Sequence, residues 1–428
     1  MTRPASPASP FSFRDYRCYW IARFTMSTAQ TAMVVIIGWQ VYDIARRTSG
    51  PAAAAFQLGL IGVVQFVPLL LLTLVVGWVA DRIDRRWIAR AAAALECLCA
   101  VTLGLLAWSG TTTLPALFLV ASLLGIARAF AGPASGALAP NLVPPEVLPR
   151  AIAMSSIAWQ SASIIGPPLG GYLYAADRAA PYFTSATMFA IAFIALMLIR
   201  PVPRTALDRT VKPWVQMVEG LRYVRRNGLV LGAISLDLFA VLLGGATAML
   251  PIYARDILHI GPEGLGHLRM APAAGASAVA LWFAWKPLRH NVGVKMLAAV
   301  AIFGAATMAF GLSRWLPLSL FCLALLGGAD MLSVFVRQTL IQLHTPDAMR
   351  GRVGAVSSLF ISGSNELGEA ESGFLAALIG PVAAVVAGGA GAILVTLLWA
   401  RWFPELRHAR NFDPPPVLDD GALQENAT

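Results

Sequence analysis

Residues 200–227, RPVPRTALDRTVKPWVQMVEGLRYVRRN, form the longest polar stretch in a chain that is otherwise strongly apolar. The chain has 428 residues, of which 57% are hydrophobic and 13% charged. Its mean hydropathy is +0.68. These proportions are typical of a membrane protein and exclude an ordinary soluble domain. The polar stretch therefore indicates a linker between two membrane-embedded halves.

Apolar runs of about 20 residues, the length that crosses the hydrocarbon core of a bilayer, recur on both sides of this linker. We predict an all-α membrane protein with twelve spans, at residues 18–41, 56–80, 91–109, 114–138, 152–175, 181–199, 229–254, 264–286, 294–312, 316–341, 354–380 and 382–402. The expected organisation is an N-terminal segment at 1–17, six-helix bundles at 18–199 and 229–402, a linker at 200–228 and a tail at 403–428.

The 32 lysines and arginines give the chain a formal net charge of +10. Most of them fall in the two terminal segments and in the loops that follow even-numbered spans, and no soluble domain remains to bind nucleic acid. The positive-inside rule then places both termini and the linker in the cytoplasm. The lipid bilayer is therefore an expected partner.

The two halves repeat each other at an offset of 202 residues. This offset aligns Leu123-Leu124-Gly125 with Leu325-Leu326-Gly327, and it aligns Gly166 with Gly368 and Gly171 with Gly373. Two six-helix halves with the same helix order are the arrangement expected of major facilitator transporters, whose substrate site lies between the halves near the midplane.

Between spans 2 and 3 runs GWVADRIDRRWIAR, which resembles the cytoplasmic loop signature of the major facilitator superfamily. A glycine lets two helices approach closely, an aspartate can cap a helix N-terminus, and arginines can bridge to acidic groups. The resemblance implies a cytoplasmic gate in which Asp81 and Arg82 hold the cytoplasmic side closed. The predicted gate residues are Gly77, Asp81, Arg82, Arg85 and Arg86. Asp84 stands where the family more often has glycine.

Two further stretches resemble motifs of this superfamily. In span 4, Arg128, Gly132 and Gly136 are spaced one turn apart, and the family associates the arginine with proton coupling. In span 5, GPPLGG resembles the Gly-Pro signature of exporters, where prolines remove backbone donors and glycines allow tight packing. The predicted hinge is Gly166, Pro167, Pro168, Gly170 and Gly171.

The second half, with EGLRYVRRN, TPDAMRGRV, SNELGEAESG and FPELR, resembles one bacterial branch of this superfamily, the enterobactin (siderophore) exporter and transmembrane secretion effector family. The resemblance covers nearly the whole chain and implies a protein of the bacterial inner membrane that exports a small hydrophobic or amphipathic molecule, such as a siderophore or a drug.

Charged residues inside spans survive where they face water or one another. Spans 1, 4, 7 and 10 line the cavity in this fold, and they hold Arg23, Arg128, Asp237, Asp330 and Arg337. The predicted proton-coupling residues are Asp237, Glu366, Glu369, Asp330 and Arg128, and the predicted cavity or substrate residues are Arg23, Arg337, Asn365, Trp159 and Glu371. Glu96 in span 3 is expected to form a structural pair near the gate, outside the cavity.

Three acids fall within span 11, in SNELGEAESG. At 100° per residue, Glu366 and Glu369 lie about 60° apart on one helix face, whereas Glu371 points elsewhere. Two carboxylates a turn apart in a poorly solvated groove repel, so one is expected to hold a proton. The alternative is a fixed hydrogen-bonded brace between the halves, with Arg337 or Arg128 as the counter-ion.

The sequence favours an exporter driven by proton antiport, with a small-molecule substrate and a proton as partners. No nucleotide-binding loop of the GxxxxGK[ST] type and no HExxH zinc motif are present, so neither ATP hydrolysis nor zinc enzymology is expected. We expect a monomer with no cofactor and no metal. The alternatives are an ion-coupled uptake symporter of the same fold and a membrane sensor that does not transport.

Overall fold

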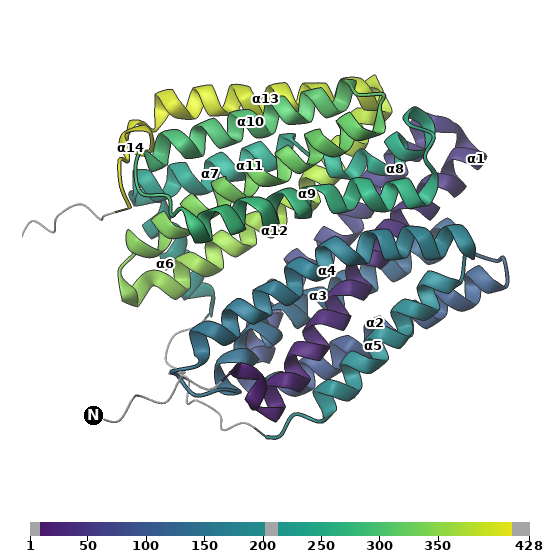
Figure 1. Ribbon diagram of the computed structural model, residues 1–428, viewed down its shortest axis with the longest axis horizontal. Helices are drawn as coiled ribbons and strands as arrows, with labels where there is room; N and C mark the ends of the chain where they lie inside the picture. Colours follow the sequence, from purple (N-terminus) through teal and green to yellow (C-terminus); the bar gives the residue numbers. More distant parts are fainter. Residues whose placement is uncertain (1–8, 202–212, 413–428) are drawn as a thin grey trace, which may run out of the picture.

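A computed structural model of the chain describes residues 9–201 and 213–412, without the side chains of residues 69, 73–78, 80, 81, 137, 213, 214, 216 and 348. Within these ranges the chain folds into helices and short connections, with no strand. Figure 1 shows two helical bundles, the first coloured from purple through blue to teal and the second from teal-green to yellow. The start of α1 (Arg14–Arg82) and the short α14 (Pro404–His408) lie at one end, which we call the terminal end.

The opposite end, which we call the distal end, holds the break in α1 and the short helix α8 (Leu250–Ile252). Gly50 has a φ of +86° there, a conformation that glycine adopts readily and other residues rarely do. The break turns α1 into two membrane crossings, because Gln30 before it and Gln65 after it line the same cavity.

The remaining helices of the first bundle are α2 (Arg85–Trp108), α3 (Leu114–Leu138), α4 (Leu148–Ala176) and α5 (Ala180–Met197). The linker region contributes α6 (Pro213–Arg226). The second bundle contains α7 (Gly228–Leu243), η3 (Ala246–Met249), α8, the π segment η4 (Tyr253–Ile257), α9 (Gly261–Trp285), α10 (Val292–Leu312), α11 (Leu316–Leu343), α12 (Asp347–Ile379) and α13 (Pro381–Trp402). Two short 3-10 turns, η1 (Pro10–Ser12) and η2 (Ala139–Asn141), complete the described chain.

Local sequence sets several helix starts. The Asp84 side chain accepts from the Arg86 backbone N–H at 3.0 Å and caps α2, and Asn227 caps α7 by accepting from Val230 N–H at 3.1 Å. Helices α3, α11 and α13 begin with a proline in the first turn, where the missing N–H removes no helical hydrogen bond.

The predicted fold of twelve spans in two six-helix repeats is confirmed. Two spans lie in α1, and the predicted seventh span is assembled from α7, η3, α8 and η4. Among the described residues, eight helical segments are long and apolar enough to cross a membrane by length and composition. Helices α4, α9 and α12 are not among these eight, and all three pack between the bundles: α4 against α9, and α12 against α1.

The repeat is visible in equivalent close approaches within each bundle. A side chain at Gly166 of α4 would meet the Thr28 carbonyl of α1, and a side chain at Gly368 of α12 would meet the Val241 carbonyl of α7. These two glycines are repeat partners in the sequence. They therefore pack α4 and α12 onto equivalent helices of their own bundles.

Equivalent approaches also join the two bundles. A side chain at Gly171 of α4 would meet Pro262 of α9, and a side chain at Gly373 of α12 would meet Gly59 of α1. Small residues let helices in a membrane approach closely enough for their backbones to touch. The bundles are thus closely packed toward the distal end through two pseudo-symmetric helix pairs.

Candidate functional site

An ion pair joins the two bundles near their centre. Arg128 of α3 lies 3.3 Å from a carboxylate oxygen of Glu366 on α12, and the same guanidinium donates to the Gln65 side chain of α1. Glu366 is 17% exposed and Arg128 35%, so both charges are substantially shielded from solvent. Of the two counter-ions considered for the glutamates, Arg128 is the one that contacts Glu366.

A second arginine holds Glu369, one turn further along α12. Arg269 of α9 lies 3.4 Å from Glu369 and donates to the Thr247 carbonyl at 2.9 Å. The two glutamates therefore do not share one groove without counter-ions, because each has its own arginine. Arg269 was not among the predicted site residues, although an arginine inside a predicted span is itself a signal of a functional site.

The position of Glu96 of α2 differs from the prediction. It was expected outside the cavity, but its carboxylate accepts from Gln30 of α1 at 2.6 Å and is fully buried in the wall of the central cavity. Its other oxygen has no hydrogen-bond partner among the described residues. The third span contributes to the cavity because α2 packs against α3, which carries Arg128.

The central cavity has a volume of about 70 Å³ and lies between the bundles. Its polar walls are the residues just described, namely Gln30, Gln65, Glu96, Arg128, Arg269 and Glu369. Two arginines and three glutamates meet around it when Glu366 is included. Because unpaired charges are costly inside a membrane, Arg128 and Arg269 serve as the counter-ions of Glu366 and Glu369.

A larger cavity of about 360 Å³ lies between α1, α3 and α4, on the terminal side of Arg128. Arg23 and Trp159, both predicted cavity residues, line it together. The Arg23 guanidinium lies 5.9 Å from the centre of the Trp159 ring, within the range of a cation–π contact.

The predicted residues of spans 7 and 10 lie apart from this cluster. Asp237 of α7 and Arg337 of α11 form an ion pair inside the second bundle, where they are 5% and 2% exposed. Asp330 and Ser333 line a cavity of about 10 Å³ next to Asp237. The structure therefore divides the predicted proton-coupling residues into a central group and a group enclosed in the second bundle.

The remaining predicted residues of α12 have no arginine partner in the described chain. Glu371 is half-buried and accepts from the Ser372 hydroxyl at 3.4 Å, while Asn365 is exposed. The GPPLGG segment lies within α4, which stays helical through both prolines. A side chain at Gly266 of α9 would meet Pro167 and Pro168, so this segment forms part of the contact between the bundles.

The family model described as Major Facilitator Superfamily matches residues 18–369, which is most of the chain. The chain belongs to the Major Facilitator Superfamily. Membership makes it a multi-pass membrane transporter of a small molecule and not an enzyme, as the sequence predicts.

Curated relatives within the superfamily include the enterobactin exporter EntS of Citrobacter koseri, 28% identical over 413 residues, covering 95% of this chain and 96% of the relative. EntS of Escherichia coli strain K12 is 26% identical over 408 residues, covering 95% of each protein. The resemblance to this exporter branch is thereby confirmed.

Solved structures with the same fold include an inward-facing, occupied bacterial homologue of the human lysosomal transporter Spinster. Its TM-score is 0.73 at 15% identity, covering 95% of this chain and 99% of that one. A D-xylose-proton symporter has a TM-score of 0.68 at 16% identity, covering 93% and 99%. At these identities the likeness concerns the major facilitator fold alone.

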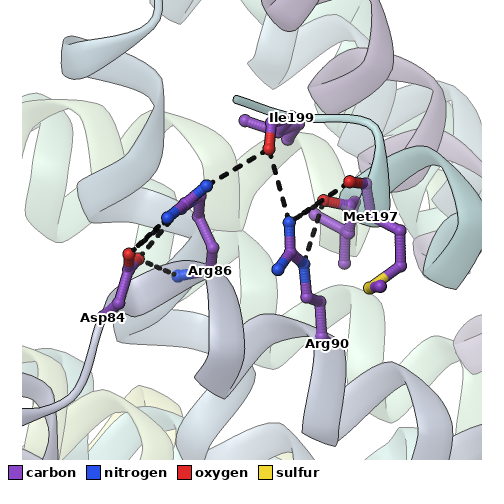
Figure 2. Close-up of polar contacts among 6 residues, drawn as sticks. Asp84, Arg86, Arg90, Met197 and Ile199 are labelled. Atoms are coloured by element: carbon purple, nitrogen blue, oxygen red, sulfur yellow. Dashed lines mark hydrogen bonds and ion pairs between the residues drawn. The ribbon is translucent and has the colours of Figure 1, made fainter. Parts of the chain in front are cut away.

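The loop signature of this superfamily contacts the end of α5. Figure 2 shows the Arg86 guanidinium paired with the Asp84 carboxylate at 2.6 Å. The same guanidinium donates a hydrogen bond to the Ile199 carbonyl at 3.3 Å. Arg90 donates to the Leu196 carbonyl at 3.0 Å and also reaches the Met197 carbonyl. Cations at a helix C-terminus complement its dipole and its unpaired carbonyls.

This geometry gives Arg86 and Arg90 a role within the first bundle that the gate prediction did not include. The predicted gate residue Arg82 is exposed and Arg85 is half-buried at the start of α2. The surroundings of Gly77 and of the Asp81 side chain lie outside what the structure describes. The latch proposed for Asp81 and Arg82 therefore stays a prediction.

At the distal end, a second set of charges joins the bundles of this transporter. Asp43 of α1 pairs with Arg255 of η4. Asp256 accepts from Tyr42 at 2.6 Å and pairs with Arg46 at 3.1 Å. The distal end is thus closed by ionic contacts between α1 and η4, in addition to the packed glycines.

Proposed function

We propose that this transporter exports a small hydrophobic or amphipathic molecule, siderophore-like or drug-like, by alternating access and proton antiport. The relatives named enterobactin exporter support export, since they align over 95% of the chain. The Gly-Pro segment of α4 supports it as well, because exporters of this superfamily carry a similar motif.

The observation that carries the coupling proposal is the ion pair between Arg128 and Glu366, which joins the bundles next to the central cavity. Proton binding neutralises Glu366 and removes its attraction for the guanidinium. One contact that holds the two halves together at the centre is then lost. Proton binding thereby changes the relative stability of the two conformations, as alternating access requires.

Antiport requires that proton and cargo exclude each other. A cargo hydroxyl or amine that donates a hydrogen bond to Glu366 or Glu369 favours the ionised carboxylate and so displaces the proton. Both carboxylates lie at the central cavity or directly beside it, where a cargo that enters between the bundles would reach them.

The expected orientation of the chain in the membrane determines which end of the transporter faces the cytoplasm. In a bacterial inner membrane with both termini in the cytoplasm, the terminal end faces the cytoplasm and the closed distal end faces outward. The conformation described here would then be inward-facing. The bundles at 18–199 and 229–402 would rock against each other as units, with the Gly-Pro segment as a hinge and residues 200–228 as the cytoplasmic linker.

The coupling is tested with purified protein in liposomes, using a fluorescent aromatic cargo such as 1-naphthalenesulfonate and an imposed pH gradient. Glu366→Gln removes the titratable group but keeps a similar size, so gradient-driven transport should fall at least tenfold while binding and folding persist. The control Glu146→Gln makes the same change in an exposed loop and should transport normally. Gradient-driven transport that survives in Glu366→Gln would exclude Glu366 as the proton carrier.

An uptake symporter remains the second candidate, because a D-xylose-proton symporter has the same fold. Antiport and symport move the proton in opposite directions relative to the cargo. A pH-sensitive dye trapped in the liposomes reads this direction. Acidification of the compartment that the cargo leaves indicates antiport, whereas acidification of the compartment that it enters indicates symport.

A further inference from the structure

The cavity between α1, α3 and α4 has a distinct charge. Its described lining residues include two arginines, Arg23 and Arg128, and no aspartate or glutamate. Arg128 is already paired with Glu366. No carboxylate in the described part of the chain pairs with Arg23, and the Arg23 Nε is buried without a hydrogen-bond partner. A guanidinium placed inside a membrane segment without a counter-ion is costly, so it points to an anion that arrives with the ligand.

The wall next to Arg23 is aromatic. Trp159 is 44% exposed, and its ring lies under the Arg23 guanidinium at 5.9 Å. The Tyr19 ring lines the same cavity, with its hydroxyl 3.3 Å from Ser155. An exposed indole face and a nearby guanidinium together bind a planar ring that carries an acidic group, since the ring stacks while the acid pairs.

The third wall is open because it is built from glycines. Gly132 and Gly136 lie one and two turns beyond Arg128 on α3, and a side chain at either position would meet no atom within 4 Å. The missing side chains leave room in the cavity rather than allowing a helix to pack. The volume of about 360 Å³ lies in the range of pockets for small organic ligands.

We propose that this cavity binds the transported molecule, and that this molecule is a small aromatic anion whose acidic group pairs with Arg23 and whose ring stacks on Trp159. The proposal rests on the proposed transport function and adds a substrate class to it. A carboxylate or a sulfonate on one or two fused rings fits the volume, the charge and the exposed ring face.

The arginine that pairs with the acidic group of the bound molecule determines how binding of this molecule and of the proton are coupled. An anion bound to Arg128 would compete with Glu366 for the same guanidinium and would favour a protonated Glu366, so that anion and proton would bind together. Antiport requires the opposite. The anion therefore belongs on Arg23, with Arg128 left to Glu366.

The first test measures binding to the full chain in lipid nanodiscs by calorimetry, with 1-naphthoate, neutral 1-naphthamide and cationic 1-naphthylmethylammonium as probes. Naphthoate should bind about tenfold to a hundredfold more tightly than naphthamide, which is the range of a charge-assisted hydrogen bond. Arg23→Gln should remove that preference and Arg23→Lys should keep part of it. Arg289→Gln, an exposed control, should bind as the parent does.

The second test does not depend on the charge of Arg23. A Cβ atom added at Gly136 has no atom within 4 Å, so Gly136→Leu places its side chain in the cavity, and naphthoate binding should fall at least tenfold while the thermal midpoint does not drop. Gly351→Leu is the matched control, since this helical glycine of α12 also has no atom within 4 Å of an added side chain. Equal binding of naphthoate and naphthamide, or unchanged naphthoate binding in Gly136→Leu, would overturn the proposal.

A proton measurement in weak buffer separates this inference from the proposed antiport. No uptake of protons when naphthoate binds agrees with an anion on Arg23. Uptake of about one proton per naphthoate would place the anion on Arg128, which overturns the assignment to Arg23. Naphthoate that binds at this cavity but is not moved by a pH gradient would contradict the antiport and leave the binding site standing.

Discussion

At the scale of single residues, the charges inside the membrane are arranged as separate pairs with different tasks. Arg128 and Glu366 join the bundles, Arg269 and Glu369 join α9 to α12, and Asp237 pairs with Arg337 inside the second bundle. The first two pairs lie at or beside the central cavity between the bundles. The third is enclosed, so its expected contribution is to stability.

The contribution of the Asp237–Arg337 ion pair to stability can be measured. Asp237→Asn leaves Arg337 buried without a counter-charge and should lower the free energy of unfolding in detergent micelles by about 3 to 5 kcal/mol. Asp237→Asn combined with Arg337→Gln removes both charges and should recover most of the loss. Asp347→Asn, which breaks an ion pair whose aspartate side chain is 89% exposed, should change it little. If Asp237→Asn abolished proton coupling and left stability intact, the pair would belong to the proton path instead.

At the scale of helices, the contact between the bundles depends on glycines that face each other across it. Gly59 and Gly62 of α1 meet α12 at Gly373 and Ala370, and Gly171 of α4 meets α9. Of these helices, α4, α9 and α12 are not among the eight segments that are apolar enough to cross a membrane by length and composition. Their glycines allow the helix backbones to touch.

A larger side chain at this contact should act on packing directly. Gly373→Val would meet the α1 backbone at Gly59, and forcing extra atoms into a packed contact costs about 1 to 3 kcal/mol. We expect a lower thermal midpoint and slower cargo transport in liposomes. Gly354→Val lies in the same helix, and an added Cβ atom there has no atom within 4 Å, so this control should change neither the thermal midpoint nor the transport rate. An equal loss in Gly354→Val would show that the effect of Gly373→Val comes from helix propensity alone.

At the scale of the whole molecule, the contacts between the bundles differ between the distal end and the terminal end. The distal end is held by packed glycines and by the charges of Asp43, Arg46, Arg255 and Asp256 between α1 and η4. The cavity of Arg23 and Trp159 lies at the other side of the central ion pair. In the proposed alternating access, opening of the distal end would break these ionic contacts, and they would then contribute to the balance between the two conformations.

Reversing one charge should shift that balance. Asp43→Arg places like charges at the α1–η4 contact and should increase the fraction of molecules with an open distal end by about fivefold, as expected for about 1 kcal/mol. Asp43→Arg with Arg255→Asp restores opposite charges and should return the parent distribution. Spin-label distances between the bundles at the distal end measure it, with Arg178→Asp, an exposed charge of the first bundle, as the control. A double variant as open as the single one would contradict this role.

The sequence by itself determined the number of spans, the division into two repeats, the family and most of the charged residues that lie inside the membrane. It could do so because a bilayer imposes span length and apolarity locally, and because a charge inside a span stands out against that background. Arg23, Arg128 and Glu366 all carry such a local signal, and all three lie at or beside the cavities between the helices.

Only the tertiary structure decided which charge faces which. Arg269 became the partner of Glu369, Glu96 entered the wall of the central cavity, Arg337 went to Asp237, and Arg86 capped the end of α5. A helix presents its side chains at 100° intervals, so their facing partners depend on how each helix is rotated and on how deep its neighbours lie. Those two quantities are set by packing contacts between residues far apart in the chain, such as Gly59 and Gly373.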